Sequence, residues 1–511
     1  MTRRLTALAL ALVLALSLTG CWEAEPEPDD FWNDDLSSPS EEEPQREPAQ
    51  ISDFTLPYLS GQTFDPVTCI DGVQQTVGAL LYEPLFTLDA SFTPQPVLCE
   101  RSSCDAQTLT WTFALHSAVF SDGTALTAND VLAAYRRAAE SARYGARFAN
   151  VASMKAQDAH TLIVTLTQAN GSFPALLDIP IVKAGTENDL VPLGTGPYVY
   201  TTAADGAALT ANPHWQGSSL PLERIALAAV KDNDTALSRF ASRSVHFLCL
   251  DPTGTGARTV GGAVESTDVP TAAMQYLGFN LSRTPLNDAA VRRAMSGVID
   301  RGTLVSSLLS GHGTAAQLPI APQDADYPKT YEYRTTAEEY AAALETSGVT
   351  AARSRSLTLL VNKENAFRCA VAESLCAQLT TAALTVTVRE LPWGEYAAAL
   401  EAGSFDLYLG EVRLTADWDV SALLDAGGAL NYGGFASEQL SAQNDALLLG
   451  GNASAARYAE GFVEETPFAP LLFKSKTVLT PSGLVDGMTP TASDPFYGFA
   501  DWSFHLSGSE S

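Results

Sequence analysis

The chain has 511 residues, of which 46% are hydrophobic and 17% are charged, so a folded globular protein of two or three domains is expected. Its formal net charge of −29 arises from 59 acidic and 30 basic residues. An acidic excess of this size repels phosphate backbones and anionic lipid headgroups, which argues against a nucleic-acid partner.

Residues 1–20 are predicted to form a lipoprotein signal peptide. Arg3 and Arg4 precede an apolar run that is shorter than the roughly 20 residues needed to span a membrane. The run ends in the sequence LTGC at Cys21, which resembles the bacterial lipobox. A lipid on Cys21 would hold the mature chain on the extracytoplasmic face of the cell membrane, facing the periplasm in a Gram-negative cell. An ordinary signal peptide that happens to precede a cysteine is the alternative.

Residues 21–50 are expected to form an acidic, proline-rich tether. From residue 22 onward this segment contains eleven acidic residues, five prolines and one arginine. Such a composition cannot bury enough apolar surface to fold, and its like charges extend it.

Six cysteines follow Cys21, an even number that permits disulfides in an exported protein. Cys99 and Cys104 lie in a stretch expected to be a loop, where a bond between them would close a small ring. Cys369 and Cys376 lie two turns apart on one predicted helix, too far apart for a bond, and are read as small core residues. The sequence leaves open whether Cys69 pairs with Cys249.

The first half of the folded body shows separate strands and one well-marked helix. The stretches 109–115 and 160–167 predict strands, and Asp122-Gly123 predicts a turn. Thr127, with Asp130 three positions later, predicts a capped helix start.

The second half alternates between helix and strand patterns. This order implies right-handed βαβ units and a parallel sheet. Helices are predicted from Asn287 and over 336–348, 366–382 and 393–403, and strands over 357–361, 384–391 and 405–409.

No catalytic, cofactor or metal motif is found. The sequence lacks a G-x-S-x-G elbow, a Walker lysine loop, an H-E-x-x-H pair and a C-x-x-C pair, and its six histidines are scattered. The prediction is therefore a protein that is not an enzyme and that has neither a cofactor nor a metal site.

Several stretches, in family order along the chain, resemble the solute-binding proteins of ABC transporters known as family 5, which bind dipeptides, oligopeptides or nickel. They are Leu80–Phe86 (LLYEPLF), Thr110–Leu115 (TWTFAL), Phe120–Val131 (FSDGTALTANDV), Gly194–Tyr198 (GTGPY), Tyr276–Asn280 (YLGFN), Pro285–Asp288 (PLND), Val291–Ala294 (VRRA), Ile299–Arg301 (IDR) and Phe405–Leu409 (FDLYL).

The resemblance implies an α/β fold of the periplasmic-binding-protein type: class II, large, with an extra subdomain and two lobes joined by a hinge. It implies a first lobe built from residues 51–75, 190–275 and 478–511, with a subdomain at 76–189. The second lobe would be 276–477. Closure of the two lobes around a ligand is the switching motion of such binders.

The resemblance also implies a ligand site just beyond the strand at 405–409. Asp417 falls where peptide-binding relatives place an aspartate that pairs with the peptide amino terminus, and such a charge-assisted bond fixes register. Trp418 is expected to offer a stacking face and Arg413 to meet a carboxylate, whereas Trp393 and Tyr396 begin a helix near the cleft. The alternatives are a turn at Asp417, core positions for the aromatic residues and a solvated Arg413.

The expected function is capture of short peptides for an ABC permease and ATPase by a monomeric, lipid-anchored binding protein. Leu414 stands where the family usually has Trp, and Val420 follows where it often has Pro. Two alternatives therefore stay open: a non-peptide solute such as a metal chelate, sugar or amino acid conjugate, or a peptide-signal sensor without import.

Overall fold

The computed structural model describes residues 51–204, 206–254 and 260–507. Contacts divide the chain into two units, 1–46 and 47–511, and all the described residues belong to the second unit. The predicted signal peptide, the lipidation site Cys21 and the tether lie outside the described residues. Within the described part of the chain, no helix is long and apolar enough to cross a membrane.

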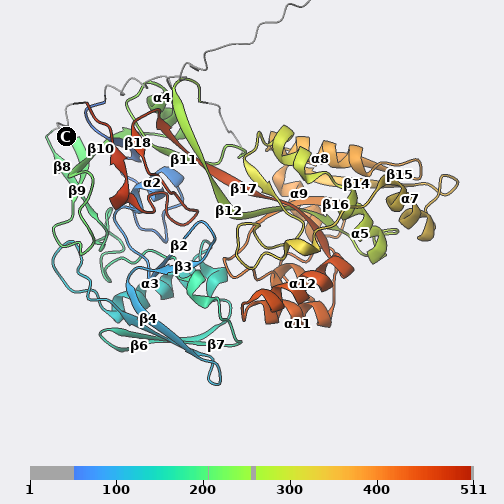
Figure 1. Cartoon of the computed structure of the whole chain (residues 1–511), viewed down its shortest axis with the longest axis horizontal. Helices are drawn as coiled ribbons and strands as arrows, with labels where there is room; N and C mark the ends of the chain where they lie inside the picture. Colours follow the sequence, from blue (N-terminus) through green and yellow to red (C-terminus); the bar gives the residue numbers. More distant parts are fainter. Residues whose placement is uncertain (1–50, 205, 255–259, 508–511) are drawn as a thin grey trace, which may run out of the picture. The chain divides into compact units, whose positions relative to one another are not determined.

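A seven-stranded sheet is the largest element of the structure (Figure 1). Its strand order is β11-β17-β12-β16-β14-β15, and β13 pairs with β17. The prediction of a parallel sheet is correct for β14, β15 and β16 but incomplete, because β11, β12, β13 and β17 add antiparallel pairs. The strands are β11 (Leu248–Leu250), β12 (Val264–Phe279), β13 (Gly313–Ala315), β14 (Arg355–Asn362), β15 (Leu384–Leu391), β16 (Leu407–Arg413) and β17 (Phe468–Pro481).

The two longest strands, β12 and β17, lie side by side in antiparallel register (Figure 1). The first half of β12 pairs only with β17, and its second half also pairs with β16, with an irregularity between Pro270 and Met274. The predicted lobe boundaries at 275/276 and 477/478 fall inside these strands. Both strands therefore run without interruption from one predicted lobe into the other.

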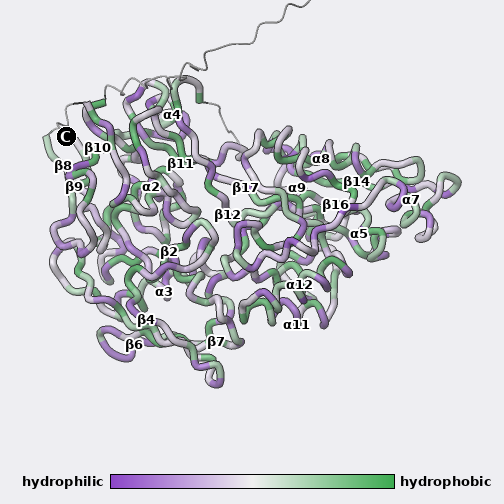
Figure 2. The backbone as a smooth tube through the Cα atoms, viewed as in Figure 1, coloured by the Kyte–Doolittle hydropathy of each residue, from purple (hydrophilic) through white to green (hydrophobic). Residues whose placement is uncertain are grey.

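Helices pack on this sheet and on one another. α8 and α9 contact β14 and β15, and α5 contacts β17, α7, α8 and α12. Apolar and polar stretches alternate along α11 and α12 (Figure 2), as expected for helices with one buried face. The elements are α5 (Ala289–Val298), α6 (Arg301–Thr303), η3 (Leu304–Leu308), η4 (Lys329–Tyr331), α7 (Ala337–Thr346), α8 (Ala366–Leu379), α9 (Trp393–Glu401), α10 (Ser421–Leu424), α11 (Glu438–Leu447) and α12 (Asn452–Glu465).

An antiparallel sheet of order β4-β5-β7-β6 packs against α3. The predicted helix start is confirmed, because the Asp130 carboxylate accepts hydrogen bonds from the backbone N–H (2.9 Å) and hydroxyl (2.6 Å) of Thr127. The elements are β4 (Cys99–Asp105), β5 (Thr110–Leu115), α3 (Ala128–Glu140), η1 (Gly145–Phe148), β6 (Val151–Asp158), β7 (Thr161–Leu166) and η2 (Phe173–Leu176).

A third sheet, of order β1-β10-β9-β8, contains the end of the GTGPY turn. A Cβ on Gly194 would lie 2.1 Å from the carbonyl oxygen of Leu81, and one on Gly196 would lie 2.5 Å from the Leu81 carbonyl carbon. Glycine is therefore required where the turn passes the backbone. The remaining elements are β1 (Thr55–Leu59), α2 (Gly72–Gly78), β2 (Phe86–Leu88), β3 (Pro94–Pro96), β8 (Tyr198–Ala203), β9 (Gly206–Ala211), β10 (Arg224–Val230), α4 (Asn233–Ala241), β18 (Val485–Asp486), η5 (Phe499–Asp501) and β19 (Ser503–Phe504).

All six described cysteines are free. The small ring considered for Cys99 and Cys104 is wrong, because both residues lie on β4 and not in a loop. Five residues of extended strand span roughly 16 Å, well beyond the reach of a disulfide. Cys376 is buried in the core as predicted, whereas Cys369 is only half-buried.

Candidate ligand-binding site

Asp417 is a buried carboxylate in the segment that follows β16. It is 5% exposed, and its Oδ2 accepts a hydrogen bond of 2.9 Å from the side-chain amide of Asn170. Asn170 is equally buried and belongs to the loop between β7 and η2, 247 residues away in the sequence. The bond therefore joins the region of the β4–β7 sheet to the exit of the seven-stranded sheet.

Backbone contacts support the same junction. The N–H of Gly171 donates to the carbonyl of Leu448, beyond α11, at 2.7 Å. A Cβ on Gly171 would lie 2.6 Å from the carbonyl oxygen of Leu449, so only glycine permits this approach.

The environment of Asp417 disfavours its charged form. Burial raises the pKa of this carboxyl, the nearby charge of Asp419 raises it further, and hydrogen bonds from Thr415 and Asn170 oppose the rise. Within the described part of the chain, no lysine, arginine or histidine forms an ion pair with Asp417. The site is a carboxylate without a counter-cation.

Trp418 is also buried, and its ring faces the protein interior. Its indole N–H donates to Asp324 at 2.8 Å, and its ring meets Phe92 edge-on at 5.1 Å and Phe473 at 5.9 Å. Trp418 is a non-glycine residue with positive φ (59°), a conformation that tertiary contacts must maintain. These contacts fix the backbone directly beside Asp417.

Arg413 is the last residue of β16 and lies opposite Ala273 of β12. Its side chain is exposed, yet the surrounding chain excludes enough water to lower the pKa of the guanidinium, and the charges of Arg143 and Arg147 lower it further. Arg413 lies four residues before Asp417, but its neighbours are other arginines, whereas Asp417 lies near another carboxylate.

Trp393 and Tyr396 lie at the start of α9 but differ in burial. Trp393 is 60% exposed and stacks on Tyr396, with ring centroids 5.8 Å apart. Tyr396 is 3% exposed, and its hydroxyl donates to the carbonyl of Leu409 at 2.9 Å. The structure thus places Tyr396 in the core and leaves Trp393 accessible.

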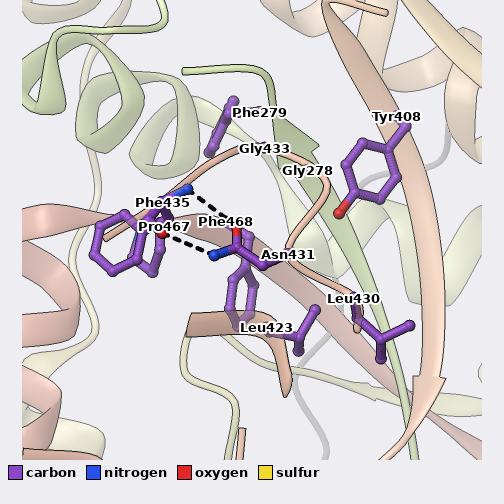
Figure 3. Close-up of a pocket in the computed structure, with 10 residues that line it drawn as sticks. All are labelled: Gly278, Phe279, Tyr408, Leu423, Leu430, Asn431, Gly433, Phe435, Pro467 and Phe468. Carbon is purple, nitrogen blue, oxygen red and sulfur yellow. Dashed lines mark hydrogen bonds between the residues drawn. The ribbon is translucent and has the colours of Figure 1, made fainter. Parts of the chain in front are cut away.

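A separate small cavity lies between β12, β16 and the segment after α10 (Figure 3). Its volume is about 10 Å³, room for at most one water molecule. Asn431 closes it by donating to the carbonyl of Phe435 and accepting from the Phe435 N–H. None of the predicted site residues lines this cavity, so it is not the proposed ligand site.

Sequence reasoning did not find Asn170 as the hydrogen-bond partner of Asp417. Asn170-Gly171 is a turn signal that carries no information about a partner 247 residues away.

Comparison with known proteins identifies the class. The model of the family "Bacterial extracellular solute-binding proteins, family 5 Middle" matches residues 93–429, more than half of the chain. The chain belongs to this family of extracellular solute-binding proteins, as the sequence motifs predict. Its members are binding proteins and not enzymes, which confirms the prediction of a non-catalytic protein.

Among curated relatives, the glutathione-binding proteins GsiB of Escherichia coli O1:K1 and Shigella dysenteriae are each 28% identical over 287 residues. The match covers 53% of this chain and 56% of each relative. The chain therefore matches only about half the length of these proteins.

Solved structures share the fold at low sequence identity. NikZ from Campylobacter jejuni with Ni(L-His) has a TM-score of 0.64 at 16% identity, with 88% of this chain and 99% of that chain covered. AppA from Bacillus subtilis with a nonapeptide has a TM-score of 0.61 at 19% identity, covering 90% and 100%. AgaA with agropinic acid, from A. tumefaciens R10, has a TM-score of 0.60 at 20% identity, covering 87% and 96%. These likenesses confirm the two-lobed α/β binding-protein fold.

Proposed function

We propose that this chain is the lipid-anchored solute-binding component of an ABC importer and that it captures short peptides between its two lobes. The observation that carries the proposal is the buried pair of Asp417 and Asn170, which joins two regions far apart in the sequence.

Within the described residues, Asp417 has no lysine, arginine or histidine as an ion-pair partner. The Asp417 carboxylate accepts hydrogen bonds from Asn170, Thr415 and the Asp419 backbone N–H, yet its pKa stays raised, so these bonds do not offset its whole desolvation cost. An ammonium group would replace or join Asn170 and would form a charge-assisted bond, which is stronger than the neutral one. Asp417 thus favours a ligand with a cationic amino group. The hydrogen bond from the Trp418 indole to Asp324 holds the backbone beside Asp417 and so positions the carboxylate.

The lobe assignment is part of the proposal. Residues 51–75, 190–275 and 478–511 would form lobe I, 76–189 its subdomain and 276–477 lobe II, with β12 and β17 as the connecting strands. Closure brings Asn170 of the subdomain onto Asp417 of lobe II. A monomer would deliver the peptide to the permease and ATPase, and the lipid on Cys21 would hold it at the membrane.

A second candidate keeps the fold and exchanges the ligand. Solved neighbours carry solutes as different as Ni(L-His), a nonapeptide and agropinic acid. Leu414, where the family usually has Trp, is consistent with a changed ligand. A metal chelate, a sugar or an amino acid conjugate is therefore the alternative.

A binding screen separates the two candidates. The purified protein is unfolded and refolded to remove carried ligand and is then tested by thermal shift with pools of di- to hexapeptides. A ligand at 100 times its Kd adds about 2.7 kcal/mol to the free energy of unfolding. A shift with peptides supports the proposal. A shift only with agropinic acid or Ni(L-His) overturns it in favour of the second candidate.

A further inference from the structure

The hairpin of β2 and β3 has a phenylalanine in its turn. Asp89 holds this turn, because its Oδ1 accepts hydrogen bonds from the backbone N–H groups of Ser91 (2.8 Å) and Thr93 (3.0 Å). Phe92 lies between them with a φ of 61°, in the left-handed region that favours glycine. The turn alone therefore gives no reason to keep an aromatic side chain at this position, because glycine would adopt the same backbone with less strain.

The ring of Phe92 contacts Trp418, which belongs to the segment after β16. The two rings meet edge-on, with their centroids 5.1 Å apart and their planes at 79°. Both side chains are buried in one apolar cluster, whose other buried members come from residues 274–473, apart from Leu88 and Ala175. Trp418 also has a positive φ, of 59°. Two aromatic residues with strained backbones thus bury each other although they are far apart in the sequence.

Phe92 completes the enclosure of the Trp418 indole. On its other sides, the ring of Phe473 on β17 meets the indole edge-on at 5.9 Å, and Asp324 accepts a hydrogen bond of 2.8 Å from the indole N–H. The apolar surface of the indole is thereby removed from water, and its one hydrogen-bond donor is satisfied. Every group of this contact belongs to the chain itself, so the contact forms without a solute.

The contact crosses the boundary between two predicted parts of the protein. Phe92 belongs to the predicted subdomain 76–189, whereas its aromatic partner belongs to the predicted second lobe 276–477. Two hydrogen bonds described above, from Asn170 and Gly171, cross the same boundary. Water can replace hydrogen bonds when the parts separate, so their net contribution to the contact is modest. The ring of Phe92 contributes buried apolar surface, whose exposure to water is unfavourable.

We propose that Phe92 is a positioning residue for solute binding: its ring is a latch that docks on Trp418 and stabilises the closed form of the protein independently of the solute. The inference rests on the proposed function only in assuming that the lobes close around the solute. A solute that binds the closed form has an apparent Kd equal to its intrinsic Kd divided by the closed fraction. Because Phe92 acts through Trp418, its loss weakens the binding of all solutes by one common factor.

Phe92→Gly tests the latch, because it removes the ring and relieves the backbone of the turn at the same time. Small-angle X-ray scattering measures closure of the purified protein without solute. If the latch shifts the closing equilibrium about 100-fold, from about 10:1 to about 1:10, the wild type is closed and Phe92→Gly is open. The same shift lowers the affinity for every solute about tenfold. Isothermal titration calorimetry with Ala-Ala-Ala and Ala-Phe-Ala measures this loss, which should be equal for the two peptides.

Leu109→Gly is the matched control. Leu109 is another non-glycine residue with a positive φ (53°), it lies in the turn between β4 and β5 of the same predicted subdomain, and it packs on the core of that subdomain. This variant should leave scattering and affinity unchanged. Phe92→Leu keeps an apolar side chain and should retain an affinity within about threefold of the wild type. Urea unfolding curves show that each variant is folded.

The outcomes separate the latch from peptide capture. Identical scattering of Phe92→Gly and the wild type, with affinities within about twofold, overturns the latch and leaves peptide capture intact. A loss confined to one of the two peptides also overturns the latch, because the ring then contacts the solute. If neither peptide binds, peptide capture fails and scattering still decides the latch: an open Phe92→Gly beside a closed wild type supports it, and identical curves overturn it.

Discussion

Asp417 and Arg413 are four residues apart in the chain, yet their charged groups lie in opposite surroundings. The carboxylate of Asp417 is buried and covered by Asn170 from a distant segment. The guanidinium of Arg413 keeps its access to solvent and lies near other cations. Burial disfavours the charge of Asp417, and under the proposed function a ligand ammonium would offset that cost. The charge of Arg413 is disfavoured by loss of water and by the neighbouring arginines.

The largest expected effect on peptide affinity comes from removing the negative charge of Asp417. Asp417→Asn should weaken the binding of peptides with a free amino terminus by about 10- to 100-fold, because a buried charge-assisted bond is lost. N-acetylated peptides should lose little. Calorimetry with both ligand forms measures the difference, and equal losses would show that Asp417 does not contact the amino terminus.

Asp417→Asn should weaken binding but should not lower the free energy of unfolding of the empty protein. Because burial raises the pKa of Asp417, its ionised form destabilises the empty protein at neutral pH, and Asn removes that cost. Denaturant unfolding without ligand should therefore show Asp417→Asn to be at least as stable as the wild type. A clear loss of stability would mean that the carboxylate is structural.

The next effect concerns the junction that covers Asp417. Gly171→Ala introduces a Cβ 2.6 Å from the carbonyl oxygen of Leu449, so the backbone must move and displace Asn170. We expect a destabilisation of about 1–3 kcal/mol and weaker peptide binding. Gly394→Ala on α9 is the control, because its Cβ would meet nothing within 4 Å. Wild-type affinity in Gly171→Ala would show that the junction plays no part in binding.

The pH dependence of affinity further distinguishes Asp417 from Arg413. As the pH falls through the raised pKa of Asp417, the carboxyl becomes protonated and affinity for an amino terminus should fall, whereas Arg413 keeps its charge. Calorimetry of the wild type and Asp417→Asn across acid pH checks this, since the variant should lose the dependence. If Asp417→Asn showed the same pH dependence of affinity as the wild type, the titrating group would not be Asp417.

Asp494 provides a stability control for that experiment. Burial raises its pKa to about 6, above the unfolded value, so its carboxyl binds a proton more tightly in the folded chain. Its effect on folding is therefore neutral below about pH 4, grows unfavourable as the pH rises toward 6 and stays so above it. Asp494→Asn should gain about 1 kcal/mol of stability at pH 7 and none at acid pH, with binding unchanged.

The smallest effects are expected on α9. Tyr396→Phe removes a buried hydrogen bond to Leu409 and should cost about 1 kcal/mol of stability without changing affinity. Trp393→Ala, at an exposed position, should change stability by less than about 0.5 kcal/mol. A tenfold loss of affinity in either variant would place α9 at the ligand after all.

Local elements could be predicted well because their signals are short-range. The capping box at Thr127, the glycines of the GTGPY turn and the helix–strand alternation from 336 to 413 all follow from nearby residues. The register of β12 with β17 could not be predicted, because it pairs residues about 200 positions apart. Likewise, a strand and a loop were not distinguished at Cys99–Asp105, where six of seven side chains are exposed.

The sequence by itself determined the family and the two-lobed binding fold, because ordered motifs and local periodicity can be recognised without knowing the tertiary structure. Only the tertiary structure decided what surrounds the carboxylate of Asp417. Asn170 donates to it from 247 residues away, and the indole of the neighbouring Trp418 is held by Asp324. Burial and Coulomb interactions depend on distances in space, so the raised pKa of Asp417 arises only when the chain has folded.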